Sequence, residues 1–540
     1  MSKGIFFTGG SVFDGSRFLA PGTAVLAEGG RISAVGTDIT PGSADVVDLA
    51  GGTLLPGFID AHAHPVQGGA QLRACDLSGA ATATEYLEII ARFAAANPDR
   101  KWITGGGWSM PAFPGGIPTA ATLDAVVPDR PVFLPNRDHH GAWVNSRALE
   151  LAGIGKDTPD PADGRIERDS GGNPVGMLQE GAMDLVSRLV PVLTEEDMYL
   201  ALLAAQEYLL SLGVTGWQDA IVGKSFGDDD VSAAYRQAAS AGKLLADVVG
   251  AQWWRRDAGL EQLDEMRYRR GHDALGRFRP TSVKMMLDGV AENHTAALLD
   301  PYYDGHGCQT ENSGLDFIDP AELPRYVAAL DAAGFQVHFH ALGDRAVRNA
   351  LNAVAAARAA NGNSGIRHHL AHLQVVHPDD IARFAALGAT ANIQALWATN
   401  EEQMTELTVP FIGERRAAWQ YPFGELAASG AHLAGGSDWP VSSPNPLLAI
   451  HVAVNRSMPE SAANPLLPHQ ALTRAQALAA YTAGSARING VAESAGAIRS
   501  GYDADFAVTD ADLSTIPDAE LCDGSVTQTW VRGQLAYGRN

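Results

Sequence analysis

Residues 54–65 read LLPGFIDAHAHP, and this stretch decides the fold class. Its apolar part, Leu54 to Ala61, predicts a buried strand, and His62 and His64 follow at the carboxyl end. Histidines two apart on a strand point to the same face, which in a barrel can be the interior. Two imidazoles at the mouth of a barrel suit a divalent metal of the zinc type. The alternative is that both are ordinary half-buried strand residues.

Seven more strand candidates follow, most of them separated by amphipathic helical stretches such as 345–360, 378–387 and 446–455. They are Val214 to Asp219, Asp247 to Trp253, Ser282 to Asp288, Gln336 to His340, His369 to Gln374, Thr390 to Gln394 and His432 to Ser437. Eight strands that alternate with helices are typical of a parallel (β/α)8 TIM barrel, so the predicted fold class is α/β.

Two features lie outside this alternation. The first two barrel strands are too far apart for one βα unit, and the segment 85–200, rich in Gly, Pro and Trp, is expected to be an insertion that covers the barrel mouth. Short β-type runs occupy 1–56 and 485–540, and neither end has enough strands for a core of its own. The two ends are therefore expected to form one composite β-sandwich beside a barrel domain at 57–484.

Three more candidate ligands fall at the same end of the predicted strands. His340 ends the fifth strand, His372 lies in the sixth, and Asp438 follows the eighth. A TIM barrel builds its active site at the carboxyl ends of its strands. We therefore expect these residues to meet the two histidines of the first strand.

Lys284, in the fourth strand, stands out because the chain has only six lysines among 39 basic residues. It lies between Val283 and Met285, where an unpaired ammonium would be costly. One interpretation is a lysine that points to the surface or pairs with Asp288. The other is a lysine that faces the site, where burial lowers its pKa and the free amine can react with carbon dioxide to give a carbamate that bridges two metals.

A series of motifs runs through nearly the whole chain. They are DAHAHP, GGGW, LDAVVPDRPV, HGAWVNSRALELAGI, DGRIERDSGGNPVGMLQEGA, KMMLDG, HALGDRAV, AHLQ, GSDWPV and AGAIRSGYDADFAV. Together they resemble the amidohydrolase superfamily of metal-dependent hydrolases, and most closely its YtcJ-like branch. The best-known activities of that branch are of the N-substituted formamide deformylase kind.

The resemblance implies one or two Zn²⁺ ions held by six residues, His62, His64, Lys284, His340, His372 and Asp438. It implies that Lys284 is N6-carboxylated, and that Asp438 and His372 are catalytic. The chain departs from the family pattern at Ala371, where a glutamate usually precedes the histidine of the sixth strand. That change removes a carboxylate that could support a ligand.

Five residues are expected to contact the substrate: His140, Trp108, Glu180, Gln394 and Trp439. His140 lies in the insertion, and Trp439 directly follows Asp438. Indoles also pack in ordinary cores, so each tryptophan alone favours packing. Several near one mouth favour a substrate with an apolar or flat portion.

The composition indicates which classes of partner and which cellular compartment to expect. The 39 basic and 62 acidic residues give a net charge of -23, which argues against nucleic acid because phosphate binding needs clustered cations. No apolar run is long enough for a membrane span, and the start MSKGIFFTGG lacks the pattern of a signal peptide. The three scattered cysteines fit a reducing compartment. We expect a cytoplasmic enzyme for a small molecule, with a homodimer as the default assembly.

The predicted function is metal-dependent hydrolysis of a non-peptide C–N bond, such as an N-formyl, N-acyl or cyclic amide. A second hypothesis is a non-hydrolytic enzyme of the decarboxylase type on the same scaffold, since a site that polarises a carbonyl serves more than one chemistry. A third is a catalytically silent protein that binds a small molecule.

Overall fold

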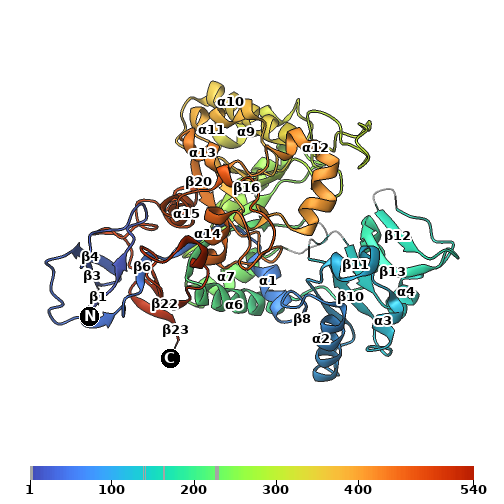
Figure 1. The fold of residues 1–540 in the computed structure, drawn as a ribbon, viewed down its shortest axis with the longest axis horizontal. Coiled ribbons are helices and arrows are strands. Elements are labelled where there is room, and N and C mark those ends of the chain that lie inside the picture. The colour runs from blue at the N-terminus through green and yellow to red at the C-terminus, as the bar shows by residue number, and fades with distance from the viewer. Residues whose placement is uncertain (1–3, 138, 140, 162–163, 226–229, 540) are drawn as a thin grey trace.

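The computed structural model describes residues 4–137, 139, 141–161, 164–225 and 230–539 (Figure 1). Its centre is a sheet of eight parallel strands, each paired with the next along the chain. The strands are β7 (Phe58–Ala63), β14 (Val214–Val222), β15 (Asp247–Trp253), β16 (Phe278–Met286), β17 (Gln336–Ala341), β18 (His369–His372), β19 (Thr390–Ile393) and β20 (His432–Gly435). The predicted TIM barrel is confirmed.

The barrel is joined between its last and first strands by the segment that follows β20. The backbone N–H of Asp438 donates to the carbonyl of His62, and the N–H of His64 donates to the carbonyl of Trp439, each at 2.7 Å. A parallel bridge pairs Ala63 with Trp439. This join places Asp438 beside the histidines of β7, although the two segments lie at opposite ends of the barrel sequence.

Helices cover the outside of the barrel, and α9, α10, α11 and α13 gather on one side of it (Figure 1). The main ones are α6 (Glu195–Ser211), α7 (Ser232–Ser240), α8 (Leu263–His272), α9 (Leu323–Ala332), α10 (Asp344–Asn361), α11 (Pro378–Leu387), α13 (Phe423–Ala428) and α14 (Pro446–Asn455). Their apolar faces pack on the strands, as Val347 and Leu351 of α10 do against β17. None of the helices in the described ranges is long and apolar enough to cross a membrane.

The prediction of a single strand from Leu54 to Ala61 is wrong, because this stretch forms two strands, β6 (Thr53–Pro56) and β7. β6 pairs with the terminal sheet, and β7 pairs with β14 of the barrel. Gly57 separates the two strands, and a Cβ at this position would lie 2.2 Å from Thr215 Oγ1. Only glycine permits this close approach, so the chain changes sheet here.

Two further sheets contain strands from the chain ends. One contains β1 (Ile5–Thr8), β3 (Ala24–Glu28), β4 (Arg31–Gly36) and β5 (Asp45–Asp48). The other contains β2 (Ser11–Val12), β6, β21 (Phe506–Thr509), β22 (Val526–Val531) and β23 (Gln534–Gly538). Phe7 and Val25 of the first sheet share one buried cluster with Phe506 and Val508 of the second.

Between β7 and β14 the chain forms a six-stranded sheet that stands as a lobe beside the barrel (Figure 1). Its strands are β8 (Cys75–Asp76), β9 (Ile103–Gly106), β10 (Val132–Pro135), β11 (Gly141–Val144), β12 (Gly164–Arg168) and β13 (Pro174–Glu180). The lobe has its own core, which includes Tyr86, Phe113 and Trp143. Helix α6 begins inside the expected 85–200 segment but runs on to Ser211, and it packs on α1 (Pro65–Leu72) and α7.

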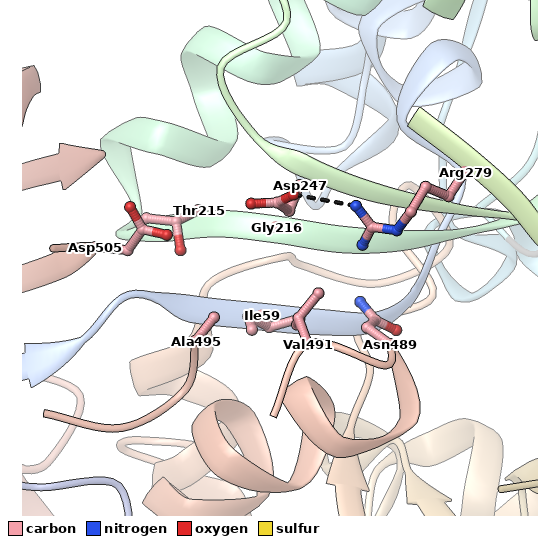
Figure 2. A pocket seen from close by; sticks show the side chains of 9 residues that line it. All are labelled: Ile59, Thr215, Gly216, Asp247, Arg279, Asn489, Val491, Ala495 and Asp505. Carbon is pink, nitrogen blue, oxygen red and sulfur yellow. Dashed lines mark hydrogen bonds and ion pairs between the residues drawn. The ribbon is translucent and has the colours of Figure 1, made fainter. Parts of the chain in front are cut away.

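The amino ends of the barrel strands enclose a cavity of about 10 Å³ (Figure 2). Its polar lining includes Asp247, Arg279 and Asn489, and Arg279 donates to Asp247 at 3.2 Å. A volume of this size holds about one water molecule. It is too small for a substrate, which leaves the carboxyl ends of the strands as the place for chemistry.

Candidate metal centre

His62 and His64 converge on one carboxylate oxygen at the barrel mouth. The Nε2 atoms of the two rings lie 3.0 Å and 3.1 Å from Oδ1 of Asp438. His62 lies on β7 and His64 directly follows it, so both rings lie at the strand end, and the joining segment holds Asp438 opposite them. The HxH pair of the sequence thus forms the centre of the cluster.

The ends of β7 and β20 are held together by Asp60, a residue that the sequence prediction missed. Its Oδ1 accepts the backbone N–H groups of His62 and Ser437, each at 3.0 Å. Burial raises the pKa of Asp60 to about 6, against the lowering effect of these hydrogen bonds. Asp60 lies in the motif IDAHAHP, but nothing in the sequence indicates that its carboxylate binds a backbone N–H group in the segment after β20.

His340 and His372 complete the imidazole cluster. Their ring centroids are 4.2 Å apart, and His372 Nδ1 lies 3.9 Å from Asp438 Oδ2. The Nε2 atoms of both rings are buried without a hydrogen-bond partner in the described part of the chain. Buried ring nitrogens ordinarily have partners, so these two are available to a ligand that the protein itself does not supply.

Lys284 lies inside this cluster, with Nζ 3.4 Å from His62 Nε2 and only 3% of the residue exposed. Burial lowers the pKa of Lys284 to about 7, while Asp438 acts in the opposite direction. The other interpretation, an ion pair with Asp288, does not describe the structure, because the hydrogen bonds of that carboxylate go to backbone N–H groups.

Asp288 fixes the loops around His340. Its Oδ1 accepts the N–H of Leu342 at 3.1 Å, and its Oδ2 accepts those of Ala297 and Gly343, each at 2.9 Å. It also lies 3.9 Å from His340 Nε2. Burial raises the pKa of Asp288 to about 7, with the three N–H groups opposing that effect. A fully buried carboxylate therefore ties the loop after β16 to the turn that follows His340.

The other histidines of the barrel lie deeper. His338 is fully buried, and its Nε2 is 2.9 Å from His62 Nδ1. His368 is buried behind the sheet, where its Nδ1 accepts the N–H of Val337 at 3.0 Å and its Nε2 lies 3.1 Å from Asp331.

The residues expected to contact substrate lie in different places. His140 is outside the described residues. Glu180 contacts Asn293 of the loop after β16. Gln394 ends β19 with 1% of the residue exposed, and neither of its amide atoms has a partner in the described chain. A buried amide with both atoms unpaired suits a polar group brought by a ligand.

The two tryptophans of that set lie in packed layers. Trp108 is fully buried in the core of the lobe, and its Nε1 donates to the carbonyl of Leu134 at 2.7 Å. Trp439 packs against Tyr208 with ring centroids 5.6 Å apart, and lies directly over Gly68 of α1. Packing and one backbone hydrogen bond account for Trp108 without a substrate.

A second cavity of about 280 Å³ opens at the carboxyl ends of the strands. Its lining includes Trp253 and the basic residues Lys224, Arg255 and Arg256. Trp253 pairs in register with Lys284 on the neighbouring strand, but none of the six candidate ligands is among the residues that line this cavity.

These contacts place His62, Lys284, His340, His372 and Asp438, together with His64, in one buried group at the barrel mouth. The nearest ligand atoms of His62, His372 and Asp438 lie within 4.8 Å of one another, a spacing that fits a bound cation. Imidazole and carboxylate groups are the donors that zinc-type cations take. The donor set therefore fits a divalent metal.

Comparison with known proteins agrees with this geometry. A model of the amidohydrolase family matches residues 45–537. The chain belongs to the amidohydrolase family. It is 31% identical to the putative amidohydrolase YtcJ of Bacillus subtilis over 92% of this chain and 90% of that protein. It is 30% identical to the N-substituted formamide deformylase of Arthrobacter pascens over 96% of this chain and 95% of that one.

A solved structure of an uncharacterized metal-dependent hydrolase from Pyrococcus horikoshii is similar throughout. The TM-score is 0.74 at 26% identity, with 96% of this chain and 99% of that chain covered. Membership of the family and this structural likeness make the chain a hydrolase of the metal-dependent type, with a His/His/Asp site at the barrel mouth.

Proposed function

We propose that this amidohydrolase cleaves a non-peptide C–N bond of a small, partly apolar or aromatic substrate, such as an N-formyl, N-acyl or cyclic amide. One observation carries the proposal. The Asp438 carboxylate lies within hydrogen-bond distance of His62 and His64, in a group where His340 and His372 each have a buried nitrogen with no partner among the described residues. A base among metal-binding groups is an arrangement that can activate water for hydrolysis of an unactivated amide.

The cation proposed for the site is Zn²⁺, in one or two copies. His62 and His64 would hold one ion and His340 and His372 the other, with Asp438 as a further ligand. When bound, such a cation lowers the pKa of water and polarises a carbonyl group. The mixture of imidazole nitrogen and carboxylate oxygen favours zinc over magnesium or calcium, which prefer oxygen ligands.

Lys284 is proposed to carry the bridge between two ions. Its amine lies among the ligand atoms, 3.4 Å from His62 Nε2. Reaction of the neutral amine with carbon dioxide forms an N–C bond and releases one proton, which leaves an anionic carbamate in place of the amine. Arginine, with a guanidinium that stays protonated, cannot do this, so the choice of lysine fits the chemistry.

Asp438 is proposed as the general base. Its position between the imidazoles allows it to accept a proton from the attacking water and to pass that proton to the leaving nitrogen. His372, 3.9 Å from the same carboxylate, is proposed to stabilise the negative charge that develops on the carbonyl oxygen. Burial of the group strengthens both effects, because charges interact more strongly where water is excluded.

The substrate class rests on the relatives and on the walls of the site. The Arthrobacter pascens relative is named for deformylation of N-substituted formamides. Trp253, the register partner of Lys284, lines the second cavity, and the amide of Gln394, which has no partner among the described residues, offers both a donor and an acceptor to a polar group. An amide with a flat substituent would use both features.

The test is a hydrolysis screen of the zinc-loaded protein against N-formyl, N-acyl and cyclic amides with aromatic substituents. The reaction is run in H₂¹⁸O, and Asp438→Asn is the matched control. The proposal expects turnover of at least one class, with one ¹⁸O in the acid product and a large loss of rate in the variant. Loss of carbon dioxide without ¹⁸O incorporation in the remaining product would instead establish the decarboxylase hypothesis.

Three other features belong to the proposal. The cytoplasm is proposed as the compartment, because the three cysteines Cys75, Cys308 and Cys522 are unpaired with one another. A homodimer is proposed as the assembly. The domain division is proposed as a sandwich from 1–56 and 485–540, and a barrel at 57–484 with the insertion 85–200 near its mouth.

A further inference from the structure

His338 is a histidine of the barrel interior that the hydrolytic chemistry above does not use. It lies on β17, two residues before His340, and no part of it is exposed. Its Nε2 is 2.9 Å from Nδ1 of His62, and the two ring centroids are 4.6 Å apart. A direct hydrogen bond between two buried imidazoles therefore connects the metal-binding group to the interior of the barrel.

The two nitrogens of His62 face opposite ways. Nε2 faces the site, 3.0 Å from Asp438 Oδ1 and 3.4 Å from Lys284 Nζ, whereas Nδ1 faces His338. A neutral imidazole that binds a metal through Nε2 carries its proton on Nδ1. That buried N–H then needs an acceptor, and among the described residues His338 Nε2 is the hydrogen-bond partner that lies against it.

The neighbours of His338 leave its Nε2 able to accept. His369, whose ring centroid is 4.1 Å away, accepts the amide N–H of Asn392 on Nδ1 at 3.2 Å. The same amide group donates to the carbonyl of Ala61 at 2.9 Å, which fixes its orientation. His369 must therefore carry its proton on Nε2, where it donates to Gln218 Oε1 at 2.8 Å. Its one N–H is directed away from His338.

The tautomer of His338 is thus decided by His62. Nδ1 of His338 has no hydrogen-bond partner among the described residues, so either tautomer leaves that atom unsatisfied. The remaining nitrogen, Nε2, pairs with whichever form His62 adopts. A metal on His62 Nε2 selects the form in which His62 donates and His338 accepts.

We propose that His338 is a positioning residue, which accepts the Nδ1–H of His62 and so fixes the tautomer and ring orientation that expose His62 Nε2 to a divalent cation. The proposal rests on the metal site of the proposed function and on none of its catalytic steps. Loss of a residue that hydrogen-bonds to a metal-binding histidine typically weakens metal binding about 10- to 100-fold.

The test is the dissociation constant of Zn²⁺, measured by chelator competition with the metal-stripped full chain. His338→Phe, which removes the acceptor but keeps a flat ring, is expected to weaken Zn²⁺ binding about 10- to 100-fold. His338→Gln, whose side-chain oxygen can accept from His62, is expected to recover most of that loss. His369→Phe is the matched control, since it removes an equally buried imidazole whose hydrogen bonds, in the described part of the chain, go to Gln218 and Asn392.

The control is expected to lower the Tm and to leave the Zn²⁺ affinity within about threefold of the parent, because it changes stability alone. Equal Zn²⁺ affinity in parent and His338→Phe would overturn the proposal, and so would an equal loss in His338→Phe and His369→Phe. If the parent itself bound no Zn²⁺, the metal chemistry of the proposed function would fail instead. The two failures are therefore distinguishable without an activity assay.

A second measurement covers the case in which His338→Phe does not fold. In the ¹⁵N-histidine-labelled parent loaded with ¹¹³Cd²⁺, the ring of His62 is expected to show its proton on Nδ1 and its coupling to cadmium on Nε2. Coupling to Nδ1, or a proton on Nε2 in the loaded protein, contradicts the assignment of His338 as acceptor.

Discussion

Removal of the Asp288 carboxylate is expected to lower the free energy of unfolding, because several backbone N–H groups at the barrel mouth bind to it. Three backbone N–H groups, those of Ala297, Leu342 and Gly343, depend on this one side chain at 2.9 to 3.1 Å. In Asp288→Ala all three are left buried and unpaired. At about 1 to 2 kcal/mol for each orphaned donor, the free energy of unfolding falls by about 4 kcal/mol.

Asp288→Asn keeps one acceptor oxygen, which can still serve the two N–H groups that now bind Oδ2. Only the N–H of Leu342 then faces an amide group, so the expected loss is about 1 to 2 kcal/mol. The ranking of parent, asparagine and alanine follows from the number of donors left unpaired.

The assay is urea unfolding of the metal-stripped protein, so that metal binding does not add to the measured stability. Asp264→Ala is the control, because that side chain is 90% exposed and its loss is expected to change the free energy by less than about 0.5 kcal/mol. A value for Asp288→Ala within 1 kcal/mol of the parent would refute the idea that this carboxylate holds the loops together.

Three further predictions concern the site and the barrel base. Asp438→Asn is expected to lower kcat about a thousandfold, because it removes the base, while metal analysis still finds the ions. Lys284→Arg is expected to lose the bridged metal and most of the activity, since a guanidinium forms no carbamate. Asp505 lines the small cavity at the amino ends of the barrel strands, and burial raises its pKa to about 6, well above the usual value near 4. As the pH rises from about 4 to about 6, the free energy of unfolding of the parent should therefore fall by about 2 kcal/mol relative to that of Asp505→Asn. Below and above this window the difference between the two proteins should not change with pH.

Each of these has a clear contrary result. Near-normal turnover in Asp438→Asn rules out its role as base. Full activity and metal content in Lys284→Arg exclude the carbamate. A difference in unfolding free energy between Asp505→Asn and the parent that does not change from pH 4 to pH 7 contradicts the raised pKa.

The barrel could be predicted because its signal is local. Each strand is a short apolar run, and the run from Asp247 to Trp253 has the same bounds in the structure. The run from Leu54 to Ala61 gave a wrong result for a physical reason. Hydrophobicity reports that a strand is buried, but it does not report in which sheet, and the change at Gly57 depends on contact with Thr215.

The ligand candidates could be found because parallel strands bring their carboxyl ends together. His62, His340 and Asp438 share that position and meet in the structure. Asp60 and Asp288 were not predicted as supports, because their partners are backbone N–H groups on other strands and loops. Such contacts depend on the register between distant segments, which leaves no pattern in a single sequence.

The position of Trp108 could not be predicted for a related reason. It was expected to contact the substrate because it lies in the insertion that was expected to cover the barrel mouth. The lobe has a core of its own, and an indole can fill that core as well as it can meet a substrate. The sequence shows where the tryptophans occur, but it does not show whether each one packs in the core of the lobe or faces the barrel mouth.

The central claim is that the buried group at the barrel mouth binds a catalytic divalent metal. The most direct measurement is anomalous diffraction at the zinc absorption edge, from crystals of the full chain grown with Zn²⁺. We expect one or two anomalous peaks in contact with His62, His64, His372 and Asp438. A well-ordered map with no peak among these side chains, or with zinc bound only elsewhere, would contradict it.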